Sequence, residues 1–253
     1  MGSYIVTGGA SGIGAAIKQQ LEAEGNRVLA VDIQEADITA NLATTEGREE
    51  ARQGILAASS DGIAGLICCA GVGAHVPDRA LITAVNYFGA VDLVEGLREA
   101  LAAGNAPVLL VSSNSAPMET QPAYVQALLA GDESGAAAIA ADMPSQPVYS
   151  GSKQALTVWM RRNVQSYAAQ GIRINAIGPG YTRTPLSAAV EDDPTYGDAI
   201  KQFIESIPVG RPGLPEDMAQ AASFLLSDKA SFICGAMLFV DGGHDAMMRP
   251  DSF

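Results

Sequence analysis

The stretch Thr7-Gly8-Gly9-Ala10-Ser11-Gly12-Ile13-Gly14 decides the fold of this chain of 253 residues. It follows a short apolar run, Tyr4–Thr7, and precedes a helical pattern over Ile13–Gly25. Glycines let backbone N–H groups come close to a ligand, and the start of a helix carries partial positive charge. This strand–turn–helix context predicts a loop that binds a diphosphate through Gly8, Ser11, Gly12, Ile13 and Gly14.

Short apolar runs alternate with helical patterns along the whole chain. Strands are expected over Tyr4–Thr7, Arg27–Asp32, Gly65–Cys69, Val108–Val111, Ile172–Ile177 and Ala236–Val240. Helices are expected over Ile13–Gly25, Thr44–Ser59, Val85–Gly104, Val148–Gly171 and Pro215–Ser227. The apolar runs are continuous, as in strands buried on both faces. We therefore predict an α/β fold over 1–253, a single Rossmann-type domain whose doubly wound parallel sheet has helices on both faces.

Two long connections interrupt this alternation. Residues 116–147 are rich in alanine and acidic side chains, and they suit two short helices near Ala123–Ala130 and Ser134–Asp142. Residues 181–210 have the length of a lid over a binding site. The lid is apolar, and two methionines near the C-terminus add to that character: Tyr181, Leu186, Tyr196, Phe203, Ile204, Ile207, Met247 and Met248. These side chains either meet a hydrophobic substrate or pack the lid against the domain.

The composition restricts the partners and the compartment. A formal charge of −13 disfavours binding to nucleic acids and to anionic membranes. Three cysteines and two histidines without metal-ligand spacing predict no metal site and no disulfide framework. No apolar run approaches the roughly 20 residues needed to cross a bilayer, and no signal segment precedes the first strand, so we expect a cytoplasmic protein.

The second predicted strand ends in Asp32, which is followed by Ile33 and Gln34. A carboxylate at this position can accept both hydroxyl groups of an adenosine ribose, and it repels a 2′-phosphate. Because no lysine or arginine lies in the loop or just after Asp32, the sequence favours NAD over NADP as cofactor.

Tyr149 and Lys153 are four residues apart, so they share one face of a predicted helix. An ammonium group near a phenol favours the phenolate and brings its pKa closer to neutral pH. Ser112 and Ser113 follow a predicted strand, at the end where doubly wound sheets bind ligands. Asn86 lies inside a predicted helix although asparagine is a mediocre helix former.

Together these motifs resemble the short-chain dehydrogenase/reductase family. The matching residues appear in order over essentially the whole chain: Thr7-Gly8, Gly12, Gly14, Cys69-Ala70-Gly71, Asn86, Ser113, Tyr149, Lys153, Pro179-Gly180 and Asp241-Gly242-Gly243. The resemblance implies that Ser113 polarises a carbonyl, Tyr149 transfers a proton, Lys153 also holds the nicotinamide ribose, and Asn86 helps to hold a relay water. It further implies contacts of Asn41 and Leu42 with the adenine and of Ala70 and Gly71 with the adenosine ribose. Pro179, Gly180 and Thr182 would lie on the nicotinamide side.

This chain departs from the family pattern in three places. Cys68-Cys69 replaces the usual Asn-Asn, which removes the contacts of the first asparagine side chain. Only nine positions lead from Asp32 to Asn41, too few for a crossover helix. Ser113 and Tyr149 are 36 positions apart, and the additional residues form the insertion 116–147. The insertion, the shortened crossover and the ending Asp241-Gly242-Gly243-His244-Asp245-Ala246-Met247-Met248-Arg249-Pro250 resemble one subgroup, the bacterial 3α-hydroxysteroid dehydrogenase/carbonyl reductases.

The resemblance implies an NAD(H)-dependent oxidoreductase that interconverts a hydrophobic, steroid- or terpenoid-like secondary alcohol and its ketone. A broad-specificity carbonyl reductase for detoxification and a non-catalytic NAD-binding regulator are the alternatives. Because the insertion lies before Tyr149, we expect it to obstruct pairing through that helix. We therefore expect a homodimer through Pro215–Ser227 and Ala236–Val240, with a tetramer as the alternative.

Overall fold

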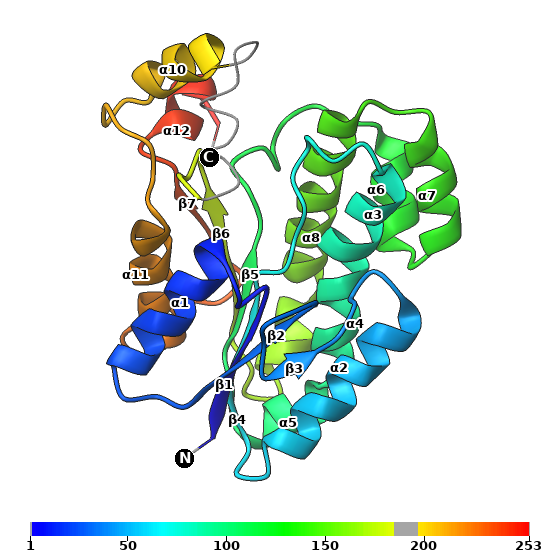
Figure 1. Cartoon of the computed structure of the whole chain (residues 1–253), viewed down its shortest axis with the longest axis vertical. Helices are drawn as coiled ribbons and strands as arrows, with labels where there is room; N and C mark the ends of the chain where they lie inside the picture. Colours follow the sequence, from blue (N-terminus) through cyan, green and yellow to red (C-terminus); the bar gives the residue numbers. More distant parts are fainter. Residues whose placement is uncertain (1, 185–196, 253) are drawn as a thin grey trace.

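The computed structural model describes residues 2–184 and 197–252. These residues form a seven-stranded, wholly parallel sheet in the order β3-β2-β1-β4-β5-β6-β7 (Figure 1). The strands are β1 (Ser3–Thr7), β2 (Val28–Asp32), β3 (Ile38–Thr39), β4 (Ile63–Cys68), β5 (Val108–Val111), β6 (Ile174–Pro179) and β7 (Met237–Val240). The predicted doubly wound parallel sheet is confirmed. The two-residue strand β3 was not predicted. The chain reaches it from β2 through a loop over 33–37, in place of the crossover helix that the sequence is too short to form.

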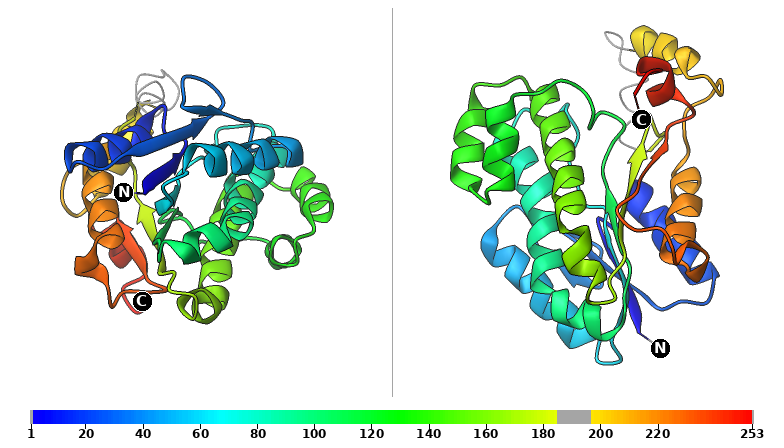
Figure 2. Two further views of the ribbon diagram at one scale, coloured as in Figure 1. Left: turned by 90° about the horizontal axis from the view of Figure 1, so that it is seen from below. Right: turned by 180° about the vertical axis from the view of Figure 1, so that it is seen from behind.

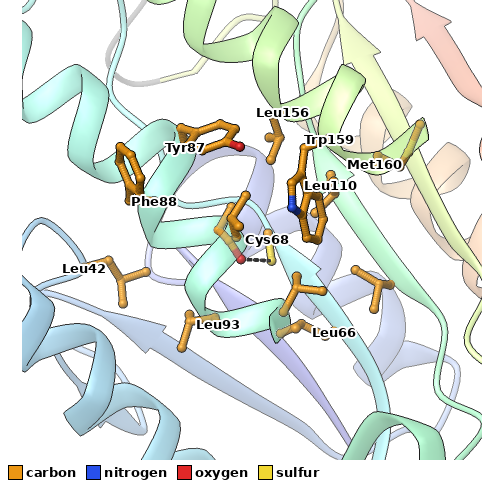
Figure 3. Packing of buried hydrophobic residues seen from close by; sticks show 14 of the residues in the cluster. Leu42, Leu66, Cys68, Tyr87, Phe88, Leu93, Leu110, Leu156, Trp159 and Met160 are labelled. Atoms are coloured by element: carbon orange, nitrogen blue, oxygen red, sulfur yellow. Dashed lines mark hydrogen bonds between the residues drawn. The ribbon is translucent and has the colours of Figure 1, made fainter. Parts of the chain in front are cut away.

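Helices cover both faces of the sheet (Figure 2). On one face lie α1 (Gly12–Ala23) and α11 (Pro215–Leu226), and on the other lie α2 (Thr45–Ala58), α4 (Gly89–Gly96), α5 (Arg98–Ala103) and α8 (Ser145–Ala168). Alternate side chains of each strand enter the two layers, so that Leu66 and Cys68 of β4 join one core and Ile67 joins the other. This two-sided burial explains the continuous apolar runs. Figure 3 shows the larger core, where Leu66 and Leu110 of the sheet lie near Trp159 of α8.

The expected helix over Val85–Gly104 is wrong as a single element. The chain instead forms α3 (Arg79–Thr83), a π-helical turn over Ala84–Phe88, then α4 and α5. At Leu97, between α4 and α5, φ is −100° and ψ is 3°, outside helical values. The π-helical turn contains Asn86, and such turns frequently occur at functional sites.

The insertion 116–147 holds two helices, within one residue of the predicted bounds: α6 (Pro122–Leu129) and α7 (Glu133–Ala141). Proline stands at the start of α6, and the Asp132 carboxylate accepts a hydrogen bond from Gly135 N at 2.9 Å at the start of α7. α6 packs against α8, and α7 packs against α3 (Figures 1 and 2). The Tyr124 and Thr83 hydroxyl groups lie 2.9 Å apart and fasten the insertion to α3.

The carboxyl ends of β6 and β7 lead into a group of short C-terminal elements. α10 (Gly197–Ser206) and α12 (His244–Met248) lie side by side beyond these strand ends (Figure 1), and a 3-10 turn over Asp228–Ala230 follows α11. Of the predicted lid residues, Leu186 and Tyr196 lie outside the described part of the chain. Within the part described, no helix is long and apolar enough to span a membrane.

Candidate active site

The predicted site residues gather at the carboxyl ends of the parallel strands. β1 lies between β2 and β4, so the strand order reverses direction beside β1. Loops on the two sides of such a switch point diverge and leave a crevice, which is where doubly wound sheets bind their ligands. The loops that follow β1, β2, β4, β5 and β6 carry the candidate residues.

The glycine loop after β1 has the form of a diphosphate cradle. Gly8 has a φ of +69°, and a Cβ atom there would lie 2.8 Å from backbone atoms of Ala70. A Cβ atom on Gly14 would lie within bonding distance of the Gly8 carbonyl oxygen. Ser11 precedes α1 in an extended conformation and makes no side-chain capping hydrogen bond, and the first turn of α1 contains no acidic residue. The start of α1 therefore fits an anionic group.

Thr7 joins the ends of β1 and β4, a role that the sequence analysis missed. Its hydroxyl oxygen accepts hydrogen bonds from Cys69 N at 3.1 Å and from Ala70 N at 3.0 Å. With cysteine at position 68, any link that the asparagine side chain would make between neighbouring strands is lost. Thr7 supplies such a link from the opposite strand, and it holds Ala70 beside the glycine loop.

Asp32 stands at the end of β2 and faces the glycine loop. Its carboxylate accepts hydrogen bonds from Ala10 N at 3.0 Å and from Ile33 N at 2.7 Å. The same side chain thus ties the glycine loop to the end of β2. Ile33 is 65% exposed and offers an apolar surface beside the carboxylate. This arrangement fits an adenosine whose ribose meets Asp32 and whose base lies on Ile33.

Asn41 and Leu42, which the resemblance assigns to the adenine, lie in the turn between β3 and α2. The Asn41 side-chain oxygen accepts a hydrogen bond from Ala43 N at 3.0 Å, which shapes the turn before α2. Leu42 is buried, and a Cβ atom on Gly89 would lie 3.2 Å from its Cβ. Leu42 therefore packs directly on the start of α4.

Ser113 and Tyr149 meet at the end of β5. The Ser113 hydroxyl accepts hydrogen bonds from Ser115 N and Ser115 Oγ, at 3.1 and 3.0 Å. It also lies near enough to the Tyr149 phenol to lower the pKa of that group. The neighbouring Ser112 is turned toward α8, where its hydroxyl donates to the Lys153 carbonyl at 3.1 Å. The structure therefore places Ser113, and not Ser112, beside the phenol.

Burial controls the ionisation of Tyr149 and Lys153. Burial raises the pKa of Tyr149, and the nearby Ser113 hydroxyl partly offsets this effect. Burial lowers the pKa of Lys153 to about 8. The Lys153 ammonium donates to the Val111 carbonyl at 2.9 Å and lies 5.9 Å from the centre of the Tyr149 ring. Lys153 was expected to bring the pKa of Tyr149 closer to neutral pH. In this geometry desolvation of the phenol is the largest effect, and it raises that pKa.

Asn86 is buried in the π-helical turn and holds the loop after β4. Its amide oxygen accepts from Val72 N at 2.8 Å, and its amide nitrogen donates to the Val72 carbonyl at 3.0 Å. A Cβ atom on Gly71 would lie 3.2 Å from the Asn86 amide oxygen and 3.5 Å from Lys153 Nζ. The structure thus brings Asn86, Gly71 and Lys153 together.

Pro179 ends β6, and Gly180 and Thr182 lead from it toward the lid. A Cβ atom on Gly180 would lie 2.6 Å from the Asp241 side chain, so glycine is needed where the strand passes the turn after β7. The Thr182 hydroxyl donates to the Gly180 carbonyl at 3.0 Å. Thr184 reaches back to the glycine loop, 3.5 Å from the Cβ position of Gly12. The segment 180–184 therefore runs from the end of β6 to the glycine loop.

A second group of residues at this end of the sheet was not predicted. The amide nitrogen of Asn114, the residue after Ser113, lies 3.2 Å from Nδ1 of the buried His244 and 3.4 Å from an Asp241 carboxylate oxygen. The His244 ring makes an edge contact with Phe203 of α10, with ring centres 4.9 Å apart. This group connects the serine loop to the lid. In the sequence, the histidine directly after the Asp241-Gly242-Gly243 motif was the feature that could have indicated it.

Comparison with known proteins agrees with this geometry. Residues 133–245 match a family model described as enoyl-(acyl carrier protein) reductase. A 3-alpha-hydroxysteroid dehydrogenase/carbonyl reductase of Comamonas testosteroni is 40% identical over 260 residues, with all of both chains covered. A cis-4-hydroxycyclohexanecarboxylate dehydrogenase of Sinomonas cyclohexanicum is 33% identical over 96% of each chain. The solved 3-alpha-hydroxysteroid dehydrogenase from Pseudomonas sp. B-0831 in complex with NADH is 43% identical, with a TM-score of 0.92 over 99% of this chain and 100% of that one.

The chain belongs to the short-chain dehydrogenase/reductase family. It is an NAD-dependent oxidoreductase that acts on CH–OH groups, as predicted. The uncapped start of α1, the carboxylate of Asp32 and the glycine contacts of the loop all fit this cofactor.

Proposed function

We propose that this enzyme interconverts a hydrophobic, alicyclic secondary alcohol of steroid or terpenoid type and its ketone. The proximity of Ser113 to Tyr149 beyond the carboxyl end of β5 carries the proposal. It places two hydroxyl groups where one substrate oxygen can meet both, with Lys153 directly behind them. NAD(H), when bound, supplies the hydride acceptor or donor.

In this proposal each residue has a defined task. Ser113 donates a hydrogen bond to the substrate oxygen, and Tyr149 gives or takes the proton at that oxygen. Lys153 holds the nicotinamide ribose and adds positive charge near Tyr149, and Asn86 fixes the loop beside them. The cofactor is held by the remaining predicted residues: Gly8, Ser11, Gly12, Ile13 and Gly14 at the diphosphate, Asp32, Ala70 and Gly71 at the adenosine ribose, Ile33, Asn41 and Leu42 at the adenine, and Pro179, Gly180 and Thr182 at the nicotinamide.

The lid 181–210 supports a hydrophobic substrate. Tyr181 and Phe203 lie in edge contact with ring centres 6.0 Å apart, and Phe203 continues to His244. An aromatic row at the carboxyl ends of β6 and β7 offers a broad, dry surface for an alicyclic ring system. The relatives named for hydroxysteroid and hydroxycyclohexane substrates support the same class.

A substrate panel tests the proposal. NADH formation is followed by absorbance with hydroxysteroids, monocyclic terpenols and simple cyclic alcohols, with NAD and NADP in parallel. We expect strong turnover of one alicyclic class with NAD. Turnover of linear or acyl-carrier substrates alone would contradict the proposed class. NADH binding without turnover on any member would favour a non-catalytic regulator.

A broad-specificity carbonyl reductase for detoxification is the second candidate. The Comamonas testosteroni relative is named for both activities, which favours this alternative. Weak activity spread over many ketones, without one preferred alcohol, would support it over the leading proposal.

We further propose a cytoplasmic homodimer that forms through α11 and β7. Its three cysteines are free thiols, which suits a reducing compartment. Phe224 on α11, Leu238 on β7 and Phe232 between them are all exposed in the isolated chain. Exposing several large apolar side chains in one region to water is unfavourable, and such a patch commonly marks an interface with a partner. The mass in solution tests this arrangement: Phe232→Glu should shift a dimer toward monomer, whereas a tetramer bundled through α8 would overturn it.

A further inference from the structure

Arg48, on the first turn of α2, is a buried cation that no step of the proposed reaction uses. It is only 4% exposed. Its guanidinium meets the Glu133 carboxylate in a bidentate pair, with Nη2–Oε2 at 2.6 Å and Nη1–Oε1 at 3.2 Å. Asp92 of α4 adds an ion pair at Nε, with 2.7 Å between the atoms. A buried charge with this many partners is expensive to separate from any of them.

The remaining donors of Arg48 reach the segment in front of α2. Nη1 donates to the Leu42 carbonyl at 3.4 Å, and Nη2 donates to the Thr45 hydroxyl at 3.1 Å. One planar group thus ties together α7 of the insertion, α4 and the end of the segment that leads from β3 to α2. Only arginine can meet partners in so many directions with a rigid fork of donors.

Leu42 connects this cluster to the cofactor site. It packs on Gly89 of α4 and belongs to the same core as Phe88 and Leu93 (Figure 3). A Cβ atom on Gly47 would coincide with the Asn41 carbonyl, so α2 and the segment Asn41–Leu42 are pressed together without free space. Arg48 and Gly47 thus contact the backbone of Leu42 and Asn41 directly, so we expect a displacement of Arg48 to move both residues.

We propose that Arg48 is a positioning residue through which helix α7 of the insertion sets the affinity for the adenine half of NAD. Glu133 holds the guanidinium, the guanidinium holds Leu42, and Leu42 forms the adenine wall. This inference rests on the proposed assignment of Asn41 and Leu42 to the adenine. It gives the insertion a task in cofactor binding as well as in covering α8.

The variant Glu133→Gln tests the coupling, because glutamine keeps the shape and removes the charge. Glu49→Gln is the matched control, since Glu49 forms an exposed pair with Arg52 on the same helix, also at 2.6 Å. Arg48→Lys is a second variant that keeps the charge and loses the fork. For each, we would measure the Kd of NADH, the Ki of ADP-ribose, kcat and KM with NAD, and turnover with nicotinamide mononucleotide, which lacks the adenine half.

For Glu133→Gln and Arg48→Lys we expect the Kd of NADH and the Ki of ADP-ribose to rise together by about 5-fold or more. The KM for NAD should rise by the same factor, while kcat and the reaction with nicotinamide mononucleotide stay unchanged. In the control Glu49→Gln, all of these quantities should stay unchanged. A lower Tm with unchanged NADH and ADP-ribose affinities would show a merely structural ion pair and overturn the proposal. An equal loss with nicotinamide mononucleotide would also overturn it. Failure of the unmodified enzyme to bind ADP-ribose would instead refute the adenosine site itself.

Discussion

The two hydrogen bonds that the Thr7 hydroxyl accepts predict a lower free energy of unfolding for the variant Thr7→Val. Thr7 is buried, and valine has nearly its shape, so the change removes the acceptor without making a cavity. Cys69 N and Ala70 N then lose their partner. A buried donor without a partner costs about 1–3 kcal/mol. Because Cys69 and Ala70 are only partly buried, water meets some of this cost, and we expect a total of about 2 kcal/mol.

For a chain of this size, that loss lowers the Tm by about 4 to 8 °C, measurable by differential scanning calorimetry. The Kd of NADH should rise as well, because Ala70 is no longer held beside Gly8. Thr7→Ser is the control, since it keeps the hydroxyl and removes one methyl group, at a cost of about 1 kcal/mol. If Thr7→Val is as stable as Thr7→Ser and binds NADH equally well, the hydroxyl does not hold the two loops together and the reasoning fails.

Three further variants test the site. Tyr149→Phe should lower kcat by at least about 100-fold and leave the Kd of NADH unchanged, and near-normal turnover would refute its role in proton transfer. Asp32→Ala should raise the ratio of kcat/KM with NADP to that with NAD by about 10-fold or more, because a carboxylate no longer repels the 2′-phosphate; an unchanged ratio would show another selector. Burial lowers the pKa of Lys153 from 10.5 to about 8. Between pH 8 and 10.5 the unfolded chain therefore binds more protons at Lys153 than the folded chain does. The contribution of Lys153 to the free energy of unfolding rises with pH across this range. Chemical denaturation of Lys153→Met should therefore show its stability relative to wild type falling from about pH 8 upward, and a difference independent of pH would count against this ionisation.

The sheet and most of its helices followed from local patterns. The strands of the core are continuous apolar runs, and the helices of the insertion begin at a proline and after an aspartate. Two features could not be read in this way. β3 pairs only Ile38 and Thr39 with β2, so it depends on a neighbour rather than on its own residues. The π-helical turn contains Asn86, whose side chain pairs with the Val72 backbone, fourteen residues away.

The site residues also divide into those that local motifs indicate and those that only long-range contacts bring together. The motifs placed Ser113, Tyr149 and Lys153 together because each stands at a fixed position relative to a strand or helix. The bonds of Thr7 and Arg48 join residues 62 and 85 positions apart, and no local pattern reports such pairs. The ionisation of Tyr149 also depended on burial, which the helical spacing to Lys153 did not show.

The cofactor side of the crevice is held by side chains that bind the backbone of a neighbouring loop. Thr7 holds the loop after β4, Asp32 holds the glycine loop, and Asn86 holds Val72 from both sides. These hydrogen bonds hold the backbone of each loop in place. The cofactor side is therefore already ordered before any ligand binds, which reduces the entropy lost on binding. The lid combines backbone hydrogen bonds to Gly213 and Gly242 with ring contacts, such as Phe203 on His244. Ring contacts tolerate changes of size and angle better than paired hydrogen bonds do. Substitutions in the lid can therefore change the accepted substrate while the choice of cofactor, held by the loops, remains the same.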